Sequence, residues 1–308
     1  VQAAGFGMRS WPKGTRPALL AAGTAAVLLL IFGWLTRPVT LAASSLPSHV
    51  ADPIKGERLF HAGGCASCHG AGLEGGLELV TPFGTFRAPN ISPDPDAGIG
   101  KWRDLDFVNA MKFGVSPAGR HYYPAFPYTS YARMRLPDLL DLKAYIDSFQ
   151  AVAAAVPDHD IGFPWNLRRG IGLWKRRYLD SSPVLPVAAG EDLLEQGRDL
   201  VEGVGHCAEC HTPRDGFGGP RRAQWLAGGP SPDDEGRVPN ITPHEDGLAD
   251  WSDRDIVRYL KSGFTPDYDT VGGSMTKVQE NLARLSDRDR AAIAAYLKAV
   301  PSLPDPSG

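Results

Sequence analysis

The stretch CASCH at residues 65–69 has the form C-x-x-C-H, and the same form returns as CAECH at residues 207–211. Two thiols three positions apart can each bond one vinyl group of a porphyrin, while the histidine that follows turns onto the iron. The spacing therefore predicts two covalently bound haem c groups. The predicted attachment residues are Cys65, Cys68, Cys207 and Cys210, and the predicted proximal iron ligands are His69 and His211.

Cysteine pairs also occur in two other kinds of site. Both pairs together could form a four-thiolate zinc site, and either pair alone could form a thioredoxin-like redox pair. Neither alternative explains why a histidine directly follows each pair. The two motifs contain all four cysteines of the 308-residue chain, so none is left for a disulfide or a nucleophile.

The composition is that of an ordinary globular protein, with an excess of glycine and proline that suits loops around a haem. At 308 residues the chain is long enough for two domains of ordinary size. The formal net charge is −1 for residues 50–150, +2 for 151–189 and −8 for 190–308. The second half is therefore acidic, and because nothing resembles a basic nucleic-acid surface we expect no nucleic-acid partner.

The N-terminal region contains an apolar run, residues 18–35 (ALLAAGTAAVLLLIFGWL), without a charged residue. As a helix it would be about 27 Å long, close to the hydrocarbon thickness of a bilayer. Basic residues before the run (Arg9, Lys13 and Arg16) keep the N-terminus in the cytoplasm by the positive-inside rule. We predict a cytoplasmic segment at 1–16 and a single-pass transmembrane anchor at 17–36, with the haem regions in the periplasm.

A cleaved signal peptide is the alternative to an anchor, with Thr40-Leu41-Ala42 as a weak processing site. The apolar run is longer than the usual core of a signal peptide, which favours the anchor. The predicted orientation also agrees with the attachment of c-type haem on the outer side of the bacterial inner membrane. Residues 37–49 are small, polar and bounded by proline, and we predict a short tether there.

The two motifs lie in halves that repeat the same order of segments. APNISP at residues 88–93 is matched by VPNITP at 238–243. Each half ends in an amphipathic stretch of helical period, at residues 137–149 and 286–300. The expected boundaries are a first domain at 50–150, an aromatic and basic connector at 151–189, a second domain at 190–303 and a tail at 304–308.

Each half also has a glycine in the helical stretch before its motif, Gly56 or Gly197, and a tyrosine in its closing helix, Tyr145 or Tyr296. Glycine has no side chain to hold another helix away. We therefore expect the first and last helices of each half to cross closely.

This arrangement is typical of a class I cytochrome c domain, and from about residue 50 to 303 the chain resembles the dihaem c-type cytochromes. These include the cytochrome subunits of membrane-bound alcohol and gluconate dehydrogenases. The resemblance rests on the motifs quoted above and on YPAFPY at 123–128, GGSM at 272–275 and AYLK at 295–298. It implies an all-α fold of two tandem class I cytochrome c domains after a single transmembrane helix. It does not identify the partner enzyme, and several of those subunits carry three haems.

A haem used only for electron transfer normally takes a sixth iron ligand from the protein, and a methionine thioether raises the reduction potential. In the second half Met275 is the only methionine, and it follows two glycines that let its loop approach the haem. We predict Met275 as the sixth ligand there. In the first half, Met134 lies 66 positions after Cys68, much as Met275 lies 65 after Cys210, and we predict Met134 as the ligand.

The ligand of the first haem has alternatives. The resemblance indicates that relatives often carry methionine where this chain has Phe126. Counted back from the closing helices, Met134 aligns with Leu285, which is a plain core position. His121 is the second candidate, and it would give a lower potential. Met111 lies inside a predicted helix and is expected to belong to the core.

Four other residues are expected beside the haems. Trp102 and Trp251 could donate their indole N–H groups to haem propionates, and core packing explains them almost as well. Asn90 and Asn240 each follow a proline, and we expect them to fix loops rather than to take part in catalysis.

We predict that the chain transfers single electrons from a dehydrogenase to quinone, a soluble cytochrome or a terminal oxidase. The sequence indicates no catalytic base, nucleophile or substrate pocket, so we expect the chain to have no catalytic activity of its own. One alternative is a dihaem enzyme of the peroxidase or thiosulfate-oxidising type, which would need one open iron. Another is a structural haem subunit of a respiratory complex.

The expected partners are a periplasmic or membrane-bound dehydrogenase or oxidase subunit, the bacterial inner membrane, and a soluble basic cytochrome. The last should meet the acidic second half, in which Asp233, Asp234 and Glu235 are consecutive. The connector has two interpretations. It is either a docking surface for lipid or a subunit, or a strap that packs Trp165 and Trp174 between the halves.

Overall fold

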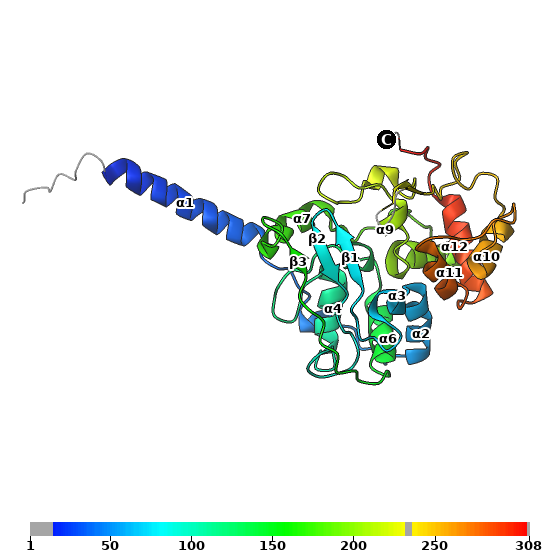
Figure 1. Cartoon of the computed structure of the whole chain (residues 1–308), viewed down its shortest axis with the longest axis horizontal. Coiled ribbons are helices and arrows are strands. Elements are labelled where there is room, and N and C mark those ends of the chain that lie inside the picture. Colours follow the sequence, from blue (N-terminus) through cyan, green and yellow to red (C-terminus); the bar gives the residue numbers. More distant parts are fainter. Residues whose placement is uncertain (1–14, 232–235, 307–308) are drawn as a thin grey trace, which may run out of the picture. The chain divides into compact units, whose positions relative to one another are not determined.

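Figure 1 shows the computed structural model of the chain, which describes residues 15–231 and 236–306. Most of the predicted cytoplasmic segment 1–16 and the acidic stretch Asp233–Glu235 lie outside the described residues. The chain divides into two units, residues 1–37 and 38–308.

The described part of the first unit is mainly one helix, α1 (Thr15–Leu35). Over Pro17–Leu35 its mean hydropathy is 2.3, and these 19 residues are enough to cross the apolar part of a bilayer. A signal sequence near the N-terminus can also be long and apolar enough to meet this criterion. The anchor at residues 17–36 therefore stays a prediction.

The first half of the second unit contains helices before and after the first motif. Its elements are η1 (Ala43–Ser45), α2 (Pro53–Ala62), α3 (Cys65–His69), β1 (Glu78–Thr81), β2 (Gly84–Arg87), α4 (Asp104–Phe113), α5 (Tyr128–Tyr131) and α6 (Leu136–Ile146). Helix α2 begins where it does because the Asp52 side chain accepts a hydrogen bond from the Ile54 N–H and Pro53 occupies the first helical position.

The second half follows the same order. Its elements are α8 (Asp192–Arg198), the π-helical turn η3 (Asp199–Val204), α9 (Ala208–His211), η4 (Arg222–Gln224), β4 (Gly229–Pro230), β5 (Arg237–Val238), α10 (Asp253–Ser262), α11 (Met275–Leu282) and α12 (Asp287–Ala299). Ser252 and Ser286 begin α10 and α12, because each hydroxyl accepts a hydrogen bond from a backbone N–H in the first turn.

The first and last helices of each half cross closely, as the sequence predicts. Helix α2 meets α6 at Gly56, where a Cβ atom would lie 2.0 Å from Asp141 O and 2.8 Å from Tyr145 Cβ. Helix α8 meets α12 at Gly197, where a Cβ atom would lie 2.0 Å from Ala292 O. No other residue type fits at either crossing without moving a helix.

Backbone hydrogen bonds show that the halves repeat one local plan. After α4, Tyr122 N donates to Gly114 O, and after α10, Val271 N donates to Gly263 O. These positions differ by the same offset of 149 residues. The matching isolated β-bridges are Val115 with His121 and Phe264 with Thr270.

Five short strands accompany the helices within the described residues, so the expectation of an all-α fold is met only in part. Strands β1 and β2 form an antiparallel hairpin, and β3 (Asp160–Ile161) pairs with β2. Strand β4 pairs with β5. The hairpin closes tightly because the Thr81 hydroxyl donates to Gly84 O at 2.8 Å. The strands thus give order to the loops that follow each motif.

The connector joins the halves and contains β3, η2 (Arg168–Gly170) and α7 (Ile171–Tyr178). Trp174 Nε1 donates to Phe217 O of the second half at 2.9 Å, and its ring meets Tyr128 of the first half edge-on. Trp165 packs edge-on against Phe83 and stays 46 % exposed. The strap interpretation is confirmed for Trp174, whereas Trp165 lies at the surface.

The predicted tether is held against the first half. Leu41 N donates to Asn109 Oδ1 at 2.7 Å, and His49 Nε2 lies 2.6 Å from Asp141 Oδ1. Leu41 and Leu46 also pack against the hydrophobic cluster. These contacts fix residues 41–49, which the polar composition alone did not predict.

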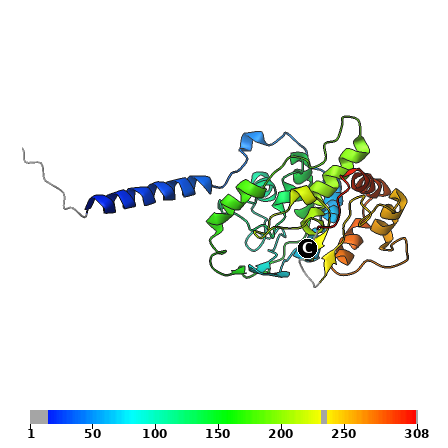
Figure 2. The same cartoon turned by 90° about the horizontal axis from the view of Figure 1, so that it is seen from above.

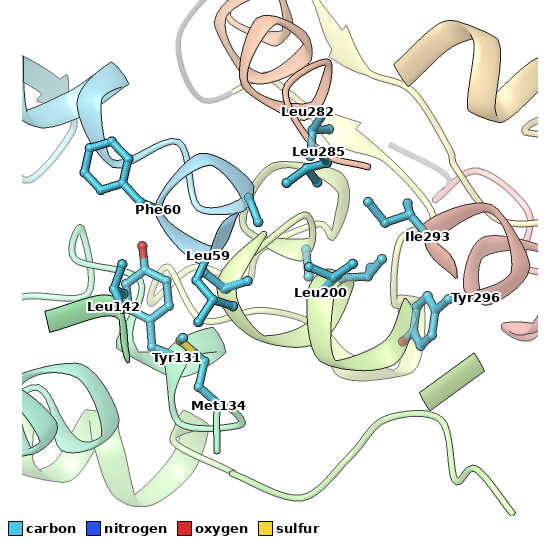
Figure 3. Close-up of a cluster of buried hydrophobic side chains, with 14 of the residues drawn as sticks. Leu59, Phe60, Tyr131, Met134, Leu142, Leu200, Leu282, Leu285, Ile293 and Tyr296 are labelled. Atoms are coloured by element: carbon cyan, nitrogen blue, oxygen red, sulfur yellow. The ribbon is translucent and has the colours of Figure 1, made fainter. Parts of the chain in front are cut away.

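The two halves share one hydrophobic cluster, in which Leu59 and Met134 of the first half meet Leu200 and Leu285 of the second (Figure 3). All four side chains are buried. Full burial of a leucine side chain stabilises the fold by roughly 2 kcal/mol. Both views of the ribbon show the halves lying against each other (Figures 1 and 2). Residues 38–308 form one compact unit, so the boundaries at 50–150 and 190–303 stay predictions.

Candidate haem-attachment sites

The first C-x-x-C-H motif forms α3, and the second forms α9 together with its N-cap residue Cys207; each motif helix begins within four residues of the end of α2 or η3. His69 Nδ1 donates to Pro89 O at 2.7 Å, and His211 Nδ1 donates to Pro239 O at 2.8 Å. A hydrogen bond at Nδ1 fixes the tautomer and leaves the lone pair of Nε2 for a metal. Burial lowers the pKa of both histidines, which favours the neutral form that binds iron.

The loops that carry these proline carbonyls are fixed by Asn90 and Asn240. Their Oδ1 atoms accept hydrogen bonds at 2.8 Å from Ser92 N and Thr242 N. Asn90 Nδ2 donates to Val152 O at 2.7 Å. In the same way, Asn240 Nδ2 donates to Leu303 O at 2.8 Å. The expectation that both asparagines fix loops is confirmed.

The four cysteines form no disulfide. Burial raises the pKa of Cys65 and of Cys207 to about 12, so both thiols are neutral near pH 7. A thioredoxin-like pair needs a thiol of lowered pKa, and these thiols are the opposite. In residues 15–231 and 236–306, no three His, Cys, Asp or Glu side chains come together to hold a metal ion, which gives no support to a zinc site. In each motif, a neutral first thiol beside a neutral, oriented imidazole fits the attachment of a haem c.

The sixth-ligand candidates lie in different surroundings. Met275 is half-buried at the first position of α11. Met134 is 4 % exposed in the shared hydrophobic cluster, and its Cγ lies 3.4 Å from the place of a Cβ on Gly203. His121 is buried, and its Nδ1 lies 3.1 Å from Lys175 Nζ. No contact with iron tests these residues, and all three stay predictions.

Three other predicted residues pack into the core. Met111 is buried within α4, as expected. Trp102 and Trp251 are partly buried against the hydrophobic cluster. In the described part of the chain neither indole N–H has a protein acceptor, so donation to a propionate also stays a prediction.

Sequence analysis missed a set of contacts that link each motif to the opposite half. Asn281 Nδ2 of α11 donates to Ser67 Oγ in the first motif at 3.0 Å. Thr129 Oγ1 and Ser130 Oγ of α5 donate to Glu209 Oε1 in the second motif at 2.7 and 2.9 Å. Ser67 and Glu209 occupy the same third position of C-x-x-C-H, so the contacts are reciprocal. A polar residue at that position of both motifs is the available sequence signal.

Aromatic rings also lie between the two motifs. Tyr131 of α5 meets His206 edge-on, with ring centroids 5.8 Å apart, and His206 directly precedes Cys207. His206 Nε2 lies 3.2 Å from Gly63 O, close to the start of the first motif. The contact between His206 and Gly63 therefore holds the N-terminal ends of the two attachment helices near each other.

Two helical C-x-x-C-H sites with loop-anchored histidines define a c-type cytochrome. A family model described as cytochrome c matches residues 54–150 and 188–301, and the chain belongs to the cytochrome c family. The repeated match agrees with the repeated local plan of the two halves. Covalently bound haem c is the cofactor of this family, and the residues present fit it.

The relatives are cytochromes and cytochrome subunits. A "Diheme cytochrome c-type" protein of Cereibacter sphaeroides is 50 % identical over 300 residues, covering 92 % of this chain and 98 % of that protein. The gluconate 2-dehydrogenase cytochrome c subunit of Pantoea cypripedii is 36 % identical, with 89 % of this chain and 64 % of the subunit covered. The cytochrome c subunit of the quinone alcohol dehydrogenase of Gluconobacter oxydans is 35 % identical, with 82 % and 55 % covered. The chain thus spans less than two thirds of either dehydrogenase subunit.

Proposed function

We propose that this chain is a membrane-anchored, periplasmic dihaem cytochrome c that takes single electrons from a dehydrogenase and passes them to quinone, a soluble cytochrome or a terminal oxidase. The observation that carries the proposal is the pair of equivalent motif helices, α3 and α9, each with its histidine bonded to a loop carbonyl. Relatives that are named as dehydrogenase cytochrome subunits support a dehydrogenase as the electron donor.

The proposed roles of the site residues follow the two motifs. The attachment residues are Cys65 and Cys68 for the first haem and Cys207 and Cys210 for the second, with His69 and His211 as proximal ligands. When bound, each haem supplies an iron that changes its oxidation state by one electron. The chain fixes the orientation of both histidines. Met275 is the proposed sixth ligand of the second haem, and Met134 stays the sequence prediction for the first.

The reciprocal contacts of the two motifs support transfer within one chain. Ser67 bonds to α11 of the second half, and Glu209 bonds to α5 of the first half. Such bonds fix the relative position of two cofactors more firmly than a flexible connector would. The proposed domains are residues 50–150 and 190–303, and the proposed anchor is residues 17–36.

A dihaem enzyme with one open iron is the second candidate function. It is favoured by one feature, which is that Phe126 has the place of Met275 when the offset of 149 residues between Tyr122 and Val271 is continued without a gap. No specific feature favours a purely structural haem subunit.

The proposal is tested by purifying the full chain from its native membranes in detergent. We expect two haems per chain, a dehydrogenase that copurifies, and reduction of both haems when the substrate of that enzyme is added. Cys68→Ala and Cys210→Ala should each lower the haem content from two to one, whereas Ser67→Ala should leave two. Haems that the copurified enzyme fails to reduce would contradict the proposed role.

A further inference from the structure

The internal repeat allows each residue around the second sixth-ligand position to be matched with one in the first half. The turn after α4 and the turn after α10 have the same bridges and hydrogen bonds at an offset of 149 residues. The offset changes from 149 at Tyr122 to 151 at Tyr128, and we place this change after Phe126, which matches Phe126 with Met275. The position that holds the proposed thioether ligand in the second half is therefore a phenyl ring in the first.

Matching from the other direction places Met134 elsewhere. Met134 N donates to Tyr131 O, and Leu285 N donates to Leu282 O, at an offset of 151 residues. Met134 and Leu285 each lie just before a closing helix and are 4 % and 5 % exposed. Figure 3 shows Met134 beside Leu59 and Tyr131 within the shared cluster. Met134 thus has the same backbone hydrogen bond and the same burial as Leu285, a residue whose side chain cannot bind iron.

His121 is matched with Thr270 and is held by the connector. Lys175 Nζ of α7 lies 3.1 Å from His121 Nδ1 and also donates to Phe113 O and Gly114 O at the end of α4. The contact with Lys175 holds the Nδ1 edge of the imidazole against α7. They give His121 a structural role that needs no haem.

Phe126 lies in a group of aromatic rings near the first motif. Its ring meets the rings of Tyr122 and Tyr131 edge-on, with centroids 5.8 and 5.5 Å apart. Tyr131 is buried, and its ring meets that of His206, whose Nε2 lies 3.2 Å from Gly63 O just before the first motif. The phenol group of Tyr131 therefore lies close to the attachment residues. Aromatic ring faces and neutral phenols suit a small uncharged molecule better than an ion.

We propose that the iron held by His69 takes no ligand from the protein on the side of Phe126 and instead binds a small uncharged diatomic molecule there. The inference rests on the proposed attachment of both haems. It concerns only the first site, because Met275 is the proposed ligand at the second. A pentacoordinate ferrous haem accepts carbon monoxide readily, whereas a haem with a methionine ligand resists it.

The test is carbon monoxide binding to the full-length chain, purified in detergent with both haems attached and reduced. We expect about one carbon monoxide per chain, with the absorption of the second haem unchanged. Phe126→Met should supply a thioether, lower the number to about zero and convert the first haem to low spin. Phe126→Leu, which changes the ring without adding a ligand, should keep the number near one.

Met134→Leu and His121→Ala remove the two rival ligands and should leave the number at about one. If either residue were the ligand, the unaltered chain would bind no carbon monoxide and the corresponding variant alone would bind it, which would overturn the proposal. Met275→Ala should raise the number from about one to about two. A haem content below two would contradict the proposed function, whereas two haems with no carbon monoxide bound would contradict this inference alone.

Discussion

Arg58 Nη2 lies 2.5 Å from Asp289 Oδ1, joining α2 of the first half to the start of α12 in the second across 231 positions of sequence. The Asp289 side chain is 2 % exposed and also accepts hydrogen bonds from Ser286 and Gln196. Burial alone would raise the pKa of this carboxyl, but the bonds from Arg58, Ser286 and Gln196 outweigh it and hold the pKa below its usual value. The ionised form of Asp289 therefore stabilises both the α12 terminus and the contact between the halves.

The lowered pKa of Asp289 predicts how stability depends on pH. The folded state binds the proton less tightly than the unfolded state, so the contribution of Asp289 is present above about pH 4 and is lost as pH falls through the folded pKa. Asp289→Asn should lower the free energy of unfolding by about 2 kcal/mol at pH 7. The difference from the unaltered chain should shrink below pH 4, as measured by urea denaturation across pH 3 to 7.

The matched control is Asp96→Asn. The Asp96 side chain is 83 % exposed in its ion pair with Lys101, and such surface pairs contribute less than about 1 kcal/mol. We expect almost no effect of this change at any pH. An equal loss in both variants, or a difference for Asp289 that does not vary with pH, would show that the buried carboxylate is not the stabilising group.

The crossing of α2 and α6 predicts a second effect on stability. Gly56→Ala would place a Cβ atom 2.0 Å from Asp141 O, so one helix has to move. Alanine improves helix propensity by about 1 kcal/mol, but overpacking costs about 1–3 kcal/mol or more and the clash with backbone should dominate. We expect a lower thermal midpoint and a lower haem content. Gly162→Ala, which meets nothing within 4 Å, should change neither quantity.

The reciprocal contacts of the motifs predict an electrostatic difference between the haems. Burial would raise the pKa of Glu209, but Arg214 and the hydroxyl of Thr129 outweigh it and hold the pKa below its usual value. A negative charge in the second motif favours the oxidised iron. Glu209→Gln should therefore raise the potential of the second haem by the equivalent of about 1 kcal/mol, or about 40 mV for one electron.

Ser67→Ala is the control for the charge of Glu209. Ser67 has the same position in the first motif and a comparable bond to the opposite half, but it carries no charge. A redox titration followed in the α-band should show the first potential almost unchanged in this variant. If Ser67→Ala shifted the potential of the first haem as much as Glu209→Gln shifts that of the second, the bond between the halves, rather than the charge, would set the potential.

Two kinds of feature in this structure are predictable from sequence. One is a set of residues close together in the chain, and the other is a position where only a small residue fits. The C-x-x-C-H motif brings its cysteines and histidine together within a short helical segment. A glycine in the first helix of each half, with a tyrosine in the last helix, indicates that these two helices cross closely. The hairpin β1–β2 was not expected, because its strands of four residues each are too short to show a clear alternation. The Asn281–Ser67 bond joins residues 214 positions apart, and such a contact follows from how the halves associate.

The uncertain assignment of Met134 has a similar physical cause. Counting forward from the cysteine pair and counting back from the closing helix give different partners, because the segment between Tyr122 and Met134 is two residues shorter than the one between Val271 and Leu285. The offset between matching backbone hydrogen bonds is 149 at Tyr122 and 151 from Tyr128 onward, so the change of length lies between these two residues. A count of residues from the cysteine pair crosses this segment and therefore cannot detect that its length differs between the halves.

The charge of the second half predicts the direction in which electrons leave the protein. Residues 190–308 contain 21 acidic and 13 basic residues, a net charge of −8, whereas residues 50–150 carry −1. A field of one sign steers an oppositely charged partner and acts on the association rate more than on affinity. The second half should therefore exchange electrons with a basic, diffusing cytochrome.

Salt provides the measurement for this direction of flow. Because exposed charges are screened beyond about 10 Å at 0.1 M ionic strength, the rate of electron exchange with a basic cytochrome should fall steeply as salt rises. Replacing Asp233, Asp234 and Glu235, which lie outside the described residues, by Asn, Asn and Gln should flatten that dependence if this stretch takes part in docking. Asp96→Asn in the first half should leave the dependence as it is. A rate of exchange that does not change with salt would show that the acidity keeps the protein soluble and does not guide its partner.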